Sequence, residues 1–576
     1  ILITLRRRRD GGMDGNLQFS TVQSNRIAGY TPSGRIGIRT GRWTLTASGS
    51  GSFTPVAESR FTETREQAGQ PLPFAGRSDS KSRTNYGRGH FSAVFDPTPK
   101  HTAGFDIEYT ERSTHMPTLS RTTLGQTQSD SRYRQHMDGN TLTATANYIW
   151  KIDTLGSQFK LIADYTRYTS DGDNSYHTTT CTPGTLRDSL YESATGSVYD
   201  ILTADAGLTR KLPHGLTLRA GLRYTRNDMA DKSRYAAQTQ GTWLALPEYS
   251  YDQHYTEQIG AAYASLEYSA GRWELSAGLR GEYTSVASQA FGRSYFGLFP
   301  NVSVSRALNA LRTWLLVAQW SRNIERPAFP ALNPARIRIS DYSWQSGNPS
   351  LRPTYIHRFS LTAVWKYRYT LTVGGNLHHD LIREIAHRDA TAPDAVYIRP
   401  ENHYTENHWF VAASVPAKIT RWWNLSVNAV GVMQRIRLNS TDSPATHYLM
   451  FADATCSFTL PAGFFAEAVY RAQSRLYSGN SEVGPRHTLS ATVKKQLFGK
   501  RLTLFCTLSN ITGCDWEFAS LTDGMRRTID TGQAWSGRLW KVGAAWNFRT
   551  GKKFRARTVE SAAETQRKRL VKSTEQ

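Results

Sequence analysis

The sequence lacks long apolar runs. In 576 residues it has no stretch of about 18 consecutive apolar side chains, the length a membrane-spanning helix needs; the densest run is the short WLLVA at 314–318. The mean hydropathy is -0.51. Transmembrane helices are therefore excluded. A membrane location is not, because the wall of a β-barrel turns only alternate residues to lipid and is polar on average.

Cysteine is also scarce. The four cysteines, Cys181, Cys456, Cys506 and Cys514, have no CxxC spacing, which argues against a zinc site and a dense disulfide framework. Cys456 and Cys506 fall in phase with apolar neighbours, as expected of small apolar packing residues. A bridge between Cys181 and Cys514 stays open, because both lie in predicted loops and a disulfide needs close Cα atoms.

Acidic residues are outnumbered: 47 Asp and Glu face 70 Lys and Arg, a formal net charge of +23. Such a balance raises nucleic acid as a partner. The basic residues are spread over polar strand positions and loops, however, and cluster only in the final GKKFRARTVESAAETQRKRLVKSTEQ. This distribution favours a solvated basic tail, and charges facing water or anionic headgroups, over nucleic-acid binding.

Motifs of covalent chemistry are missing. The sequence contains no HExxH, no GxSxG on a strand-to-helix turn and no GxxxxGK[ST], so we predict neither an enzyme nor a bound cofactor. Carboxylates such as Glu274 and Glu282 are interpreted as wall lining rather than an acid and base pair. Four histidines lie on adjacent predicted strands, but neighbouring side chains point to opposite faces, so we predict no metal site there: His378, His379, His403 and His408.

What the sequence does contain is strict alternation. In GRWELSAGLRGEYTS, residues 271–285, Trp273, Leu275 and Leu279 share one phase while Glu274 and Arg280 occupy the other. A period of two indicates a β-strand with one apolar and one polar face. It continues for about twelve residues, whereas strands of soluble proteins run for about five or six. The pattern recurs as pairs of long strands joined by tight turns that contain Gly, Pro, Asp or Asn.

Between these hairpins the connections are long and polar, as at 51–84, 170–198 and 228–255. Short turns at one end and long loops at the other are typical of outer-membrane barrels, and an even strand count is required of them. We therefore predict an all-β fold: a transmembrane antiparallel β-barrel of about 22 strands with short periplasmic turns and long extracellular loops. A β-propeller fits less well, because its strands are short.

Tryptophans recur within a residue or two of the short turns. At a headgroup boundary such amphipathic rings form a girdle, whereas in a soluble sheet they would be ordinary cross-strand packing. The predicted girdle comprises Trp43, Trp150, Trp273, Trp314, Trp365 and Trp422. The alternate phase of the strands is polar and would face a lumen that, in a barrel of this width, needs a plug.

One block carries a family resemblance: SRNIERPAFPALNPARIRISDYSWQSGNPSLRP at 321–353. It resembles the corresponding loop of TonB-dependent outer-membrane receptors of the Bacteroidetes-type outer-membrane barrel family. The matching pieces are Arg326-Pro327, Leu332-Asn333-Pro334 and Gly347-Asn348-Pro349-Ser350-Leu351. ILITLRRRRDGG at the start is similar to a last plug strand running into the first barrel strand, and VGAAWNFRTGKKF to a last barrel strand. Thr354 stands where the family usually has an acidic residue.

The resemblance implies a Gram-negative outer-membrane receptor for TonB-energised uptake of a solute. Its implied partners are outer-membrane lipid, the plug domain of a longer chain, TonB through that plug, and an unidentified solute, with the barrel as a monomer. It implies three regions: the end of a truncated plug at 1–11, the barrel at 12–549 and a basic periplasmic tail at 550–576. The chain begins at Ile1 without a signal peptide, so we expect a fragment. A non-transporting adhesin or assembly barrel, or a barrel enzyme, remains an alternative.

The resembling loop also has a local interpretation. Its X-Pro steps restrict the backbone, so we predict a structural role for Arg326, Pro327, Asn333, Pro334, Gly347, Asn348 and Pro349. Between the proline corners we expect three side chains to be exposed and to contact the solute: Asp341, Tyr342 and Trp344.

Overall fold

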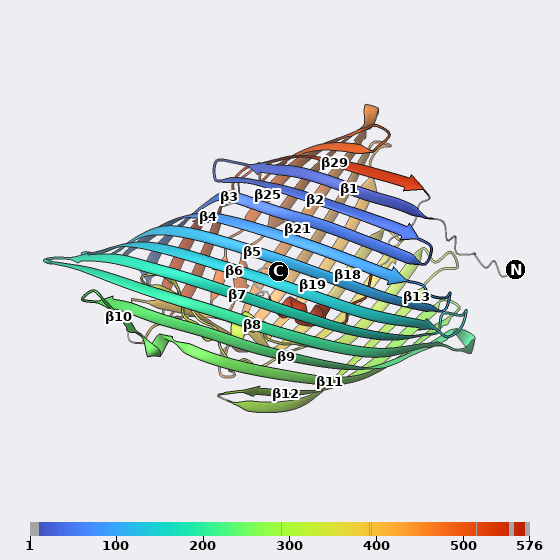
Figure 1. The fold of residues 1–576 in the computed structure, drawn as a ribbon, viewed down its shortest axis with the longest axis horizontal. Helices are drawn as coiled ribbons and strands as arrows, with labels where there is room; N and C mark the ends of the chain where they lie inside the picture. The colour runs from blue at the N-terminus through green and yellow to red at the C-terminus, as the bar shows by residue number, and fades with distance from the viewer. Residues whose placement is uncertain are drawn as a thin grey trace.

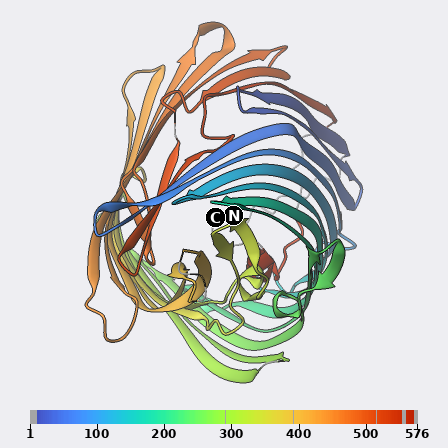
Figure 2. The ribbon, with the colours of Figure 1, turned by 90° about the vertical axis from the view of Figure 1, so that its left-hand side faces the viewer.

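The computed structural model is a closed antiparallel barrel of 22 strands, as predicted (Figures 1 and 2). It describes residues 11–551, apart from 290, 391, 393 and 514, and residues 558–570. The barrel closes because β1 pairs with β29 along their lengths, from Gly12 opposite Gly551 to Gln23 opposite Trp540. The wall strands are β1 (Gly12–Gln23), β2 (Ile27–Thr40), β3 (Trp43–Gln67), β4 (Gln70–Phe95), β5 (His101–Leu124), β6 (Thr127–Lys151), β7 (Gln158–Thr182), β8 (Thr185–Lys211), β9 (Leu216–Thr239), β11 (Tyr251–Ala270), β12 (Trp273–Ser288), β13 (Gly292–Ala307), β14 (Trp314–Glu325), β17 (Thr354–Trp365), β18 (Tyr369–Arg388), β19 (Val396–Lys418), β20 (Trp423–Arg437), β21 (Ala445–Leu460), β22 (Phe464–Gln473), β25 (Arg486–Leu497), β26 (Leu502–Ser509) and β29 (Leu539–Gly551).

The alternation read from the sequence sets the two faces of the wall. On β12 the outward phase is apolar and open, with Leu275 39%, Leu279 49% and Tyr283 54% exposed. On the alternate phase Glu282 is only 8% exposed. A period of two allows no other outcome once one face is turned outward. On β12 the apolar side chains therefore face outward and the charged side chains face the lumen.

The long polar loops expected at 51–84, 170–198 and 228–255 are largely strand, and that expectation is wrong. β3 and β4 continue to a turn at 68–69, β7 and β8 to a turn at 183–184, and β9 continues to Thr239. These arms contain many Thr and Tyr residues, which have good strand propensity. The sequence pattern does not reveal these arms as strands, because the alternation of apolar with polar side chains stops once neither face meets lipid. The backbone pairing continues.

The remaining strands belong to connections at the same end as these long hairpins. They are β10 (Thr242–Ala245), β15 (Ile337–Ser340), β16 (Ser343–Gln345), β23 (Leu476–Ser478), β24 (Ser481–Val483), β27 (Trp516–Thr522) and β28 (Met525–Gly532). β28 pairs with the far part of β3, and β24 pairs with β27. The wall is thereby extended at the long-hairpin end of the barrel.

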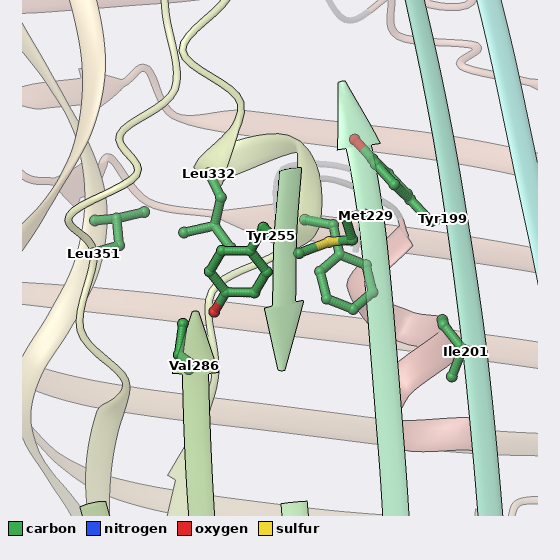
Figure 3. Packing of buried hydrophobic residues seen from close by; sticks show 8 residues of the cluster. Tyr199, Ile201, Met229, Tyr255, Val286, Leu332 and Leu351 are labelled. Carbon is green, nitrogen blue, oxygen red and sulfur yellow. The ribbon is translucent and has the colours of Figure 1, made fainter. Parts of the chain in front are cut away.

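The 326–353 segment, hereafter the lumen loop, folds back inside the barrel, where Figure 2 shows it in yellow-green. It contains α1 (Phe329–Leu332), β15 and β16, and β16 pairs in parallel with β19. Figure 3 shows its packing on the inner wall. Apolar side chains of the loop and of β8, β9, β11 and β12 form one buried cluster: Tyr199, Ile201, Met229, Tyr255, Val286, Phe329, Leu332 and Leu351.

Residues 558–570 also lie inside. α2 (Glu564–Arg567) and the 3-10 turn η4 (Lys568–Leu570) occupy the lumen beside the lumen loop (Figure 2). Ala563 is 0% and Arg569 6% exposed. The expectation of a solvated basic tail is therefore wrong for residues 558–570, because the inner wall offers carboxylates that a sequence without tertiary contacts does not reveal. Among the described residues, no helix is long and apolar enough to cross a membrane.

Candidate functional site in the barrel lumen

The lumen loop begins at a buried ionic cluster. Arg326 Nη2 donates to Glu282 Oε2 and Thr284 Oγ1, each at 2.8 Å. Its Nε lies 3.9 Å from Glu257 Oε1. The side chains of Arg326, Glu257 and Glu282 are all less than a tenth exposed. Breaking a buried pair by removing one partner costs about 3–5 kcal/mol, so this cluster fixes the point where the loop turns inward from β14.

The proline-rich motif holds the loop together internally. The backbone N–H of Gly347 donates to Asn333 O at 2.9 Å and that of Asn348 to Ala331 O at 2.7 Å. A Cβ at position 347 would lie 2.1 Å from Asn333 O, so only glycine allows this approach. The Asn348 side chain donates to Pro400 O at 3.0 Å, joining the motif to β19.

Asn333 ties the motif to β9 and β11. Its Nδ2 donates to Asp231 Oδ1 at 3.1 Å, and its Oδ1 accepts from Tyr251 Oη at 2.6 Å. Burial raises the pKa of Asp231, and hydrogen bonds from Ser197, Tyr199 and Asn333 offset this only in part. The loop is thus pinned to β9 and β11 through neutral donors rather than an ion pair.

The tip of the lumen loop, between β15 and β16, is enclosed rather than exposed. The side chain of Asp341 is 6% exposed and accepts hydrogen bonds from Ser131 Oγ at 2.6 Å, Tyr133 Oη at 2.9 Å and Thr178 Oγ1 at 3.2 Å. Arg338 Nη2 completes the set at 2.5 Å. The expectation of an exposed Asp341 is wrong. Its carboxylate is buried because hydroxyl groups of β6 and β7, together with Arg338, supply its hydrogen bonds.

Tyr342 and Trp344 are likewise only partly exposed. Tyr342 packs edge-on against Phe74, with ring centroids 5.8 Å apart. Trp344 lies between Arg336 and Arg338, whose guanidinium carbons are 5.4 and 5.5 Å from its ring centroid. All three residues predicted to contact a solute are therefore packed within the loop tip or against the barrel wall at its long-hairpin end.

A second buried ionic cluster, formed by Glu63, Arg65 and Arg527, also holds this tip. Arg527 Nη2 donates to Glu63 Oε2 at 2.8 Å and to Ser343 Oγ at 2.7 Å. Arg65 donates to Glu63 Oε1 at 2.8 Å and to the carbonyl oxygens of Tyr342 and Asp394. Burial alone would raise the pKa of Glu63, but Arg527 and Arg65 outweigh it and hold that pKa below its usual range.

A chamber of about 400 Å³ lies between the lumen loop and β18. Its lining includes Arg326, Ser346 and Gly347 from the loop and Arg383 and Glu384 from β18. Two arginines, a glutamate and residues of the loop thus line one space. A mostly formed cavity with a few fixed polar groups is the usual form of a small-molecule site.

Arg383, which lines the chamber, pairs with the buried carboxylate of Glu406, which is 0% exposed. Arg383 Nη2 lies 3.0 Å, His408 Nε2 2.8 Å and Gln434 Nε2 2.8 Å from Glu406 Oε1. His378 lies beside His408, with ring centroids 5.0 Å apart. Among the described residues, no three His, Cys, Asp or Glu side chains group in a way that could hold a metal ion.

The tryptophans near the short turns lie on the outside of the barrel. Trp43, Trp150, Trp273, Trp314, Trp365 and Trp422 are 37–50% exposed. Trp314 and Trp365 stack on neighbouring strands with centroids 5.7 Å apart. Of the cysteines, Cys181, Cys456 and Cys506 are free thiols, while Cys514 lies outside the described residues.

We compared the chain with protein families and with solved structures. The sequence profile of the outer membrane protein beta-barrel family matches residues 150–543. No curated protein matches the chain significantly. Among solved structures, the siderophore receptor PirA from Pseudomonas aeruginosa is 13% identical with a TM-score of 0.55, covering 95% of this chain and 82% of that one. A variant of the ferric enterobactin receptor PfeA from the same organism is 14% identical with a TM-score of 0.58 over 95% and 81%.

The copper transporter OprC is also similar, at 11% identity and a TM-score of 0.60, covering 94% of this chain and 81% of that one. At such low identity these likenesses establish a shared fold. The two receptors and the transporter share the barrel architecture found here.

Proposed function

Because the chain belongs to the outer membrane protein beta-barrel family, we propose that it forms the translocation barrel of a receptor that takes up a solute with energy delivered by TonB. The protein is a β-barrel of the Gram-negative outer membrane, built like TonB-dependent receptors. The observation that carries the proposal is a lumen chamber of about 400 Å³ lined by a loop that is pinned to the inner wall at its root, at Asn333 and at its tip. In the proposal, energy delivered through TonB moves this loop and opens a path through the lumen.

In this proposal the six outward tryptophans form the girdle at the membrane boundary. The barrel acts as a monomer, and a plug domain of the full-length chain sits in the lumen and contacts TonB. The solute enters the chamber beside Arg326, Arg383 and Glu384. Asp341, Tyr342 and Trp344 meet the solute only when the tip of the lumen loop leaves its clamp, and they contribute no covalent chemistry.

Filling the chamber is expected to reduce transport strongly. Ser346 lines the chamber, whereas Ser350 lies exposed on the same loop outside it. We expect Ser346→Trp to lower solute uptake about tenfold or more, equal to about 1.4 kcal/mol of lost binding, because the indole takes the volume that the solute needs. Ser350→Trp is the matched control and should transport normally.

Uptake is measured in cells expressing the full-length parent, with and without TonB, using radiolabelled ferric chelates, cobalamin, oligosaccharides and peptides as probes. The proposal predicts TonB-dependent accumulation of one probe class. Absence of energy-dependent uptake for every class, together with absence of TonB binding, would contradict it.

A further inference from the structure

The C-terminal segment 558–570 follows the inner wall of the barrel away from its short-turn end. Near that end, Lys160 Nζ and Glu560 Oε2 are 2.6 Å apart, and Lys160 lies two positions beyond the first residue of β7, Gln158. The backbone N–H of Ala562 donates to Asp164 Oδ2 at 2.7 Å, and Ala563 is 0% exposed. The contact at Asp164 lies farther along β7 than the contact at Lys160, so residues 558–570 run through the lumen away from the short turns.

The far end of this segment reaches the root of the lumen loop. Arg569 Nη1 donates to Glu257 Oε2 at 2.5 Å, and Arg569 Nε donates to Pro327 O at 2.9 Å. Its guanidinium carbon lies 4.2 Å from the ring centroid of Phe329. The side chain is 7% exposed. One arginine thus contacts the wall, the loop backbone and the loop's buried aromatic residue.

The contact between Arg569 and Glu257 gives a buried carboxylate a hydrogen-bonded cation. Glu257 and Glu282 are two buried carboxylates on the inner wall; Arg326 and Arg569 pair with Glu257, while Arg326 and Arg280 pair with Glu282. Without Arg569, the nearest cation to Glu257 would be Arg326 at 3.9 Å. A buried carboxylate that loses its hydrogen-bonded cation is costly. The wall therefore presents a guanidinium site that the C-terminal segment fills.

We propose that residues 558–570 are an internal latch that docks in the lumen from the periplasmic side and holds the lumen loop in its closed position. Arg569 is the element that couples latch to loop, through Glu257 and Pro327. Since β29 ends at Gly551 on the periplasmic side, the latch inserts and withdraws at the end of the barrel opposite the solute. Withdrawal frees the root of the loop and widens the lumen. This inference requires a membrane barrel but does not depend on TonB-energised uptake.

The test is the ion conductance of the 576-residue chain in planar lipid bilayers. A variant that ends at residue 557 should conduct several-fold better than the parent, and Arg569→Ala should fall between them. Lys568→Ala is the matched control, because the Lys568 side chain is 63% exposed and pairs with Glu564 of the same segment. It should conduct like the parent. Heat-modifiable migration on gels verifies that each variant is a folded barrel.

Adding the latch back in trans separates docking from a general effect of truncation. A synthetic peptide of residues 558–570, TVESAAETQRKRL, should lower the conductance of the truncated barrel when added on the periplasmic side. The same peptide carrying Arg569→Ala should not. Equal conductance of the parent and truncated chains would overturn the latch, and equal block by the two peptides would overturn the role of Arg569.

Discussion

Replacing Leu279 with arginine is expected to destabilise the folded barrel by about 2–4 kcal/mol, the cost of a cation on the lipid face near the bilayer midplane. Leu279 lies on the outward phase of β12, six positions beyond Trp273 at the short turn, and is 49% exposed. A transmembrane strand needs about 9–11 residues to cross the hydrocarbon, which places Leu279 near the middle. Urea unfolding of the barrel in phospholipid vesicles measures the difference.

Ser276→Arg is the matched control on the same strand. Ser276 faces the lumen and lies opposite Glu267 in the register of β11 and β12. A cation there meets water and a carboxylate, so we expect a change below about 1 kcal/mol, as for exposed charge pairs. Equal costs at 276 and 279 would show that the two phases of β12 do not meet different solvents.

Replacing Glu63 with alanine is expected to release the tip of the lumen loop. Arg65 and Arg527 would remain buried without their carboxylate, at a cost of about 3–5 kcal/mol. Both arginines also bind the backbone or side chains of Tyr342 and Ser343, so their displacement undocks the β15–β16 hairpin. Trypsin should then cut after Arg338, whose side chain is only 14% exposed in the docked hairpin of the parent.

Asp79→Ala provides the comparison for this variant. Asp79 pairs with Arg60 and Arg77 on the outer face of the same strand pair and is 40% exposed. Exposed pairs contribute about 0–1 kcal/mol, so we expect no new tryptic cleavage. Cleavage of both variants to the same extent would show that the buried cluster does not clamp the hairpin.

The same cluster predicts the response of the loop to acid. The pKa of Glu63 is depressed in the folded state. Its contribution to stability is therefore complete above the ordinary glutamate pKa of 4.5 and is lost as the pH falls through the folded value. Cleavage of the hairpin in the parent by pepsin, which is active in acid, should rise only as the pH falls below that range, while Glu63→Ala should be cleaved at every pH at which pepsin works.

The wall of the barrel could be predicted from the sequence because its signal is local. Alternation in a stretch such as 271–285 fixes which side chains share a face, and the tight turns fix the pairing of neighbours. The observed number of wall strands, 22, agrees with the number predicted from the repeated hairpin pattern. The number and order of strands follow from repetition of one hairpin unit, without knowledge of any distant contact.

The interior could not be predicted in the same way, because it depends on residues far apart in the chain. Asp341 looks exposed between two proline corners, yet it is buried by Ser131 and Thr178 from the opposite wall. Arg569 looks like part of a solvated tail, yet it meets Glu257, 312 positions earlier. A motif predicts local backbone shape, as Gly347 illustrates, but not which wall the loop will meet.

The most direct test of this account is the solvent met by alternate residues of β12 in a lipid bilayer. Spin labels at positions 275 and 277 should be accessible to oxygen dissolved in the acyl chains and protected from a water-soluble nickel complex. Labels at 274 and 276 should show the reverse. Water exposure at 275 and 277, with 274 and 276 in apolar surroundings, would contradict the barrel described here.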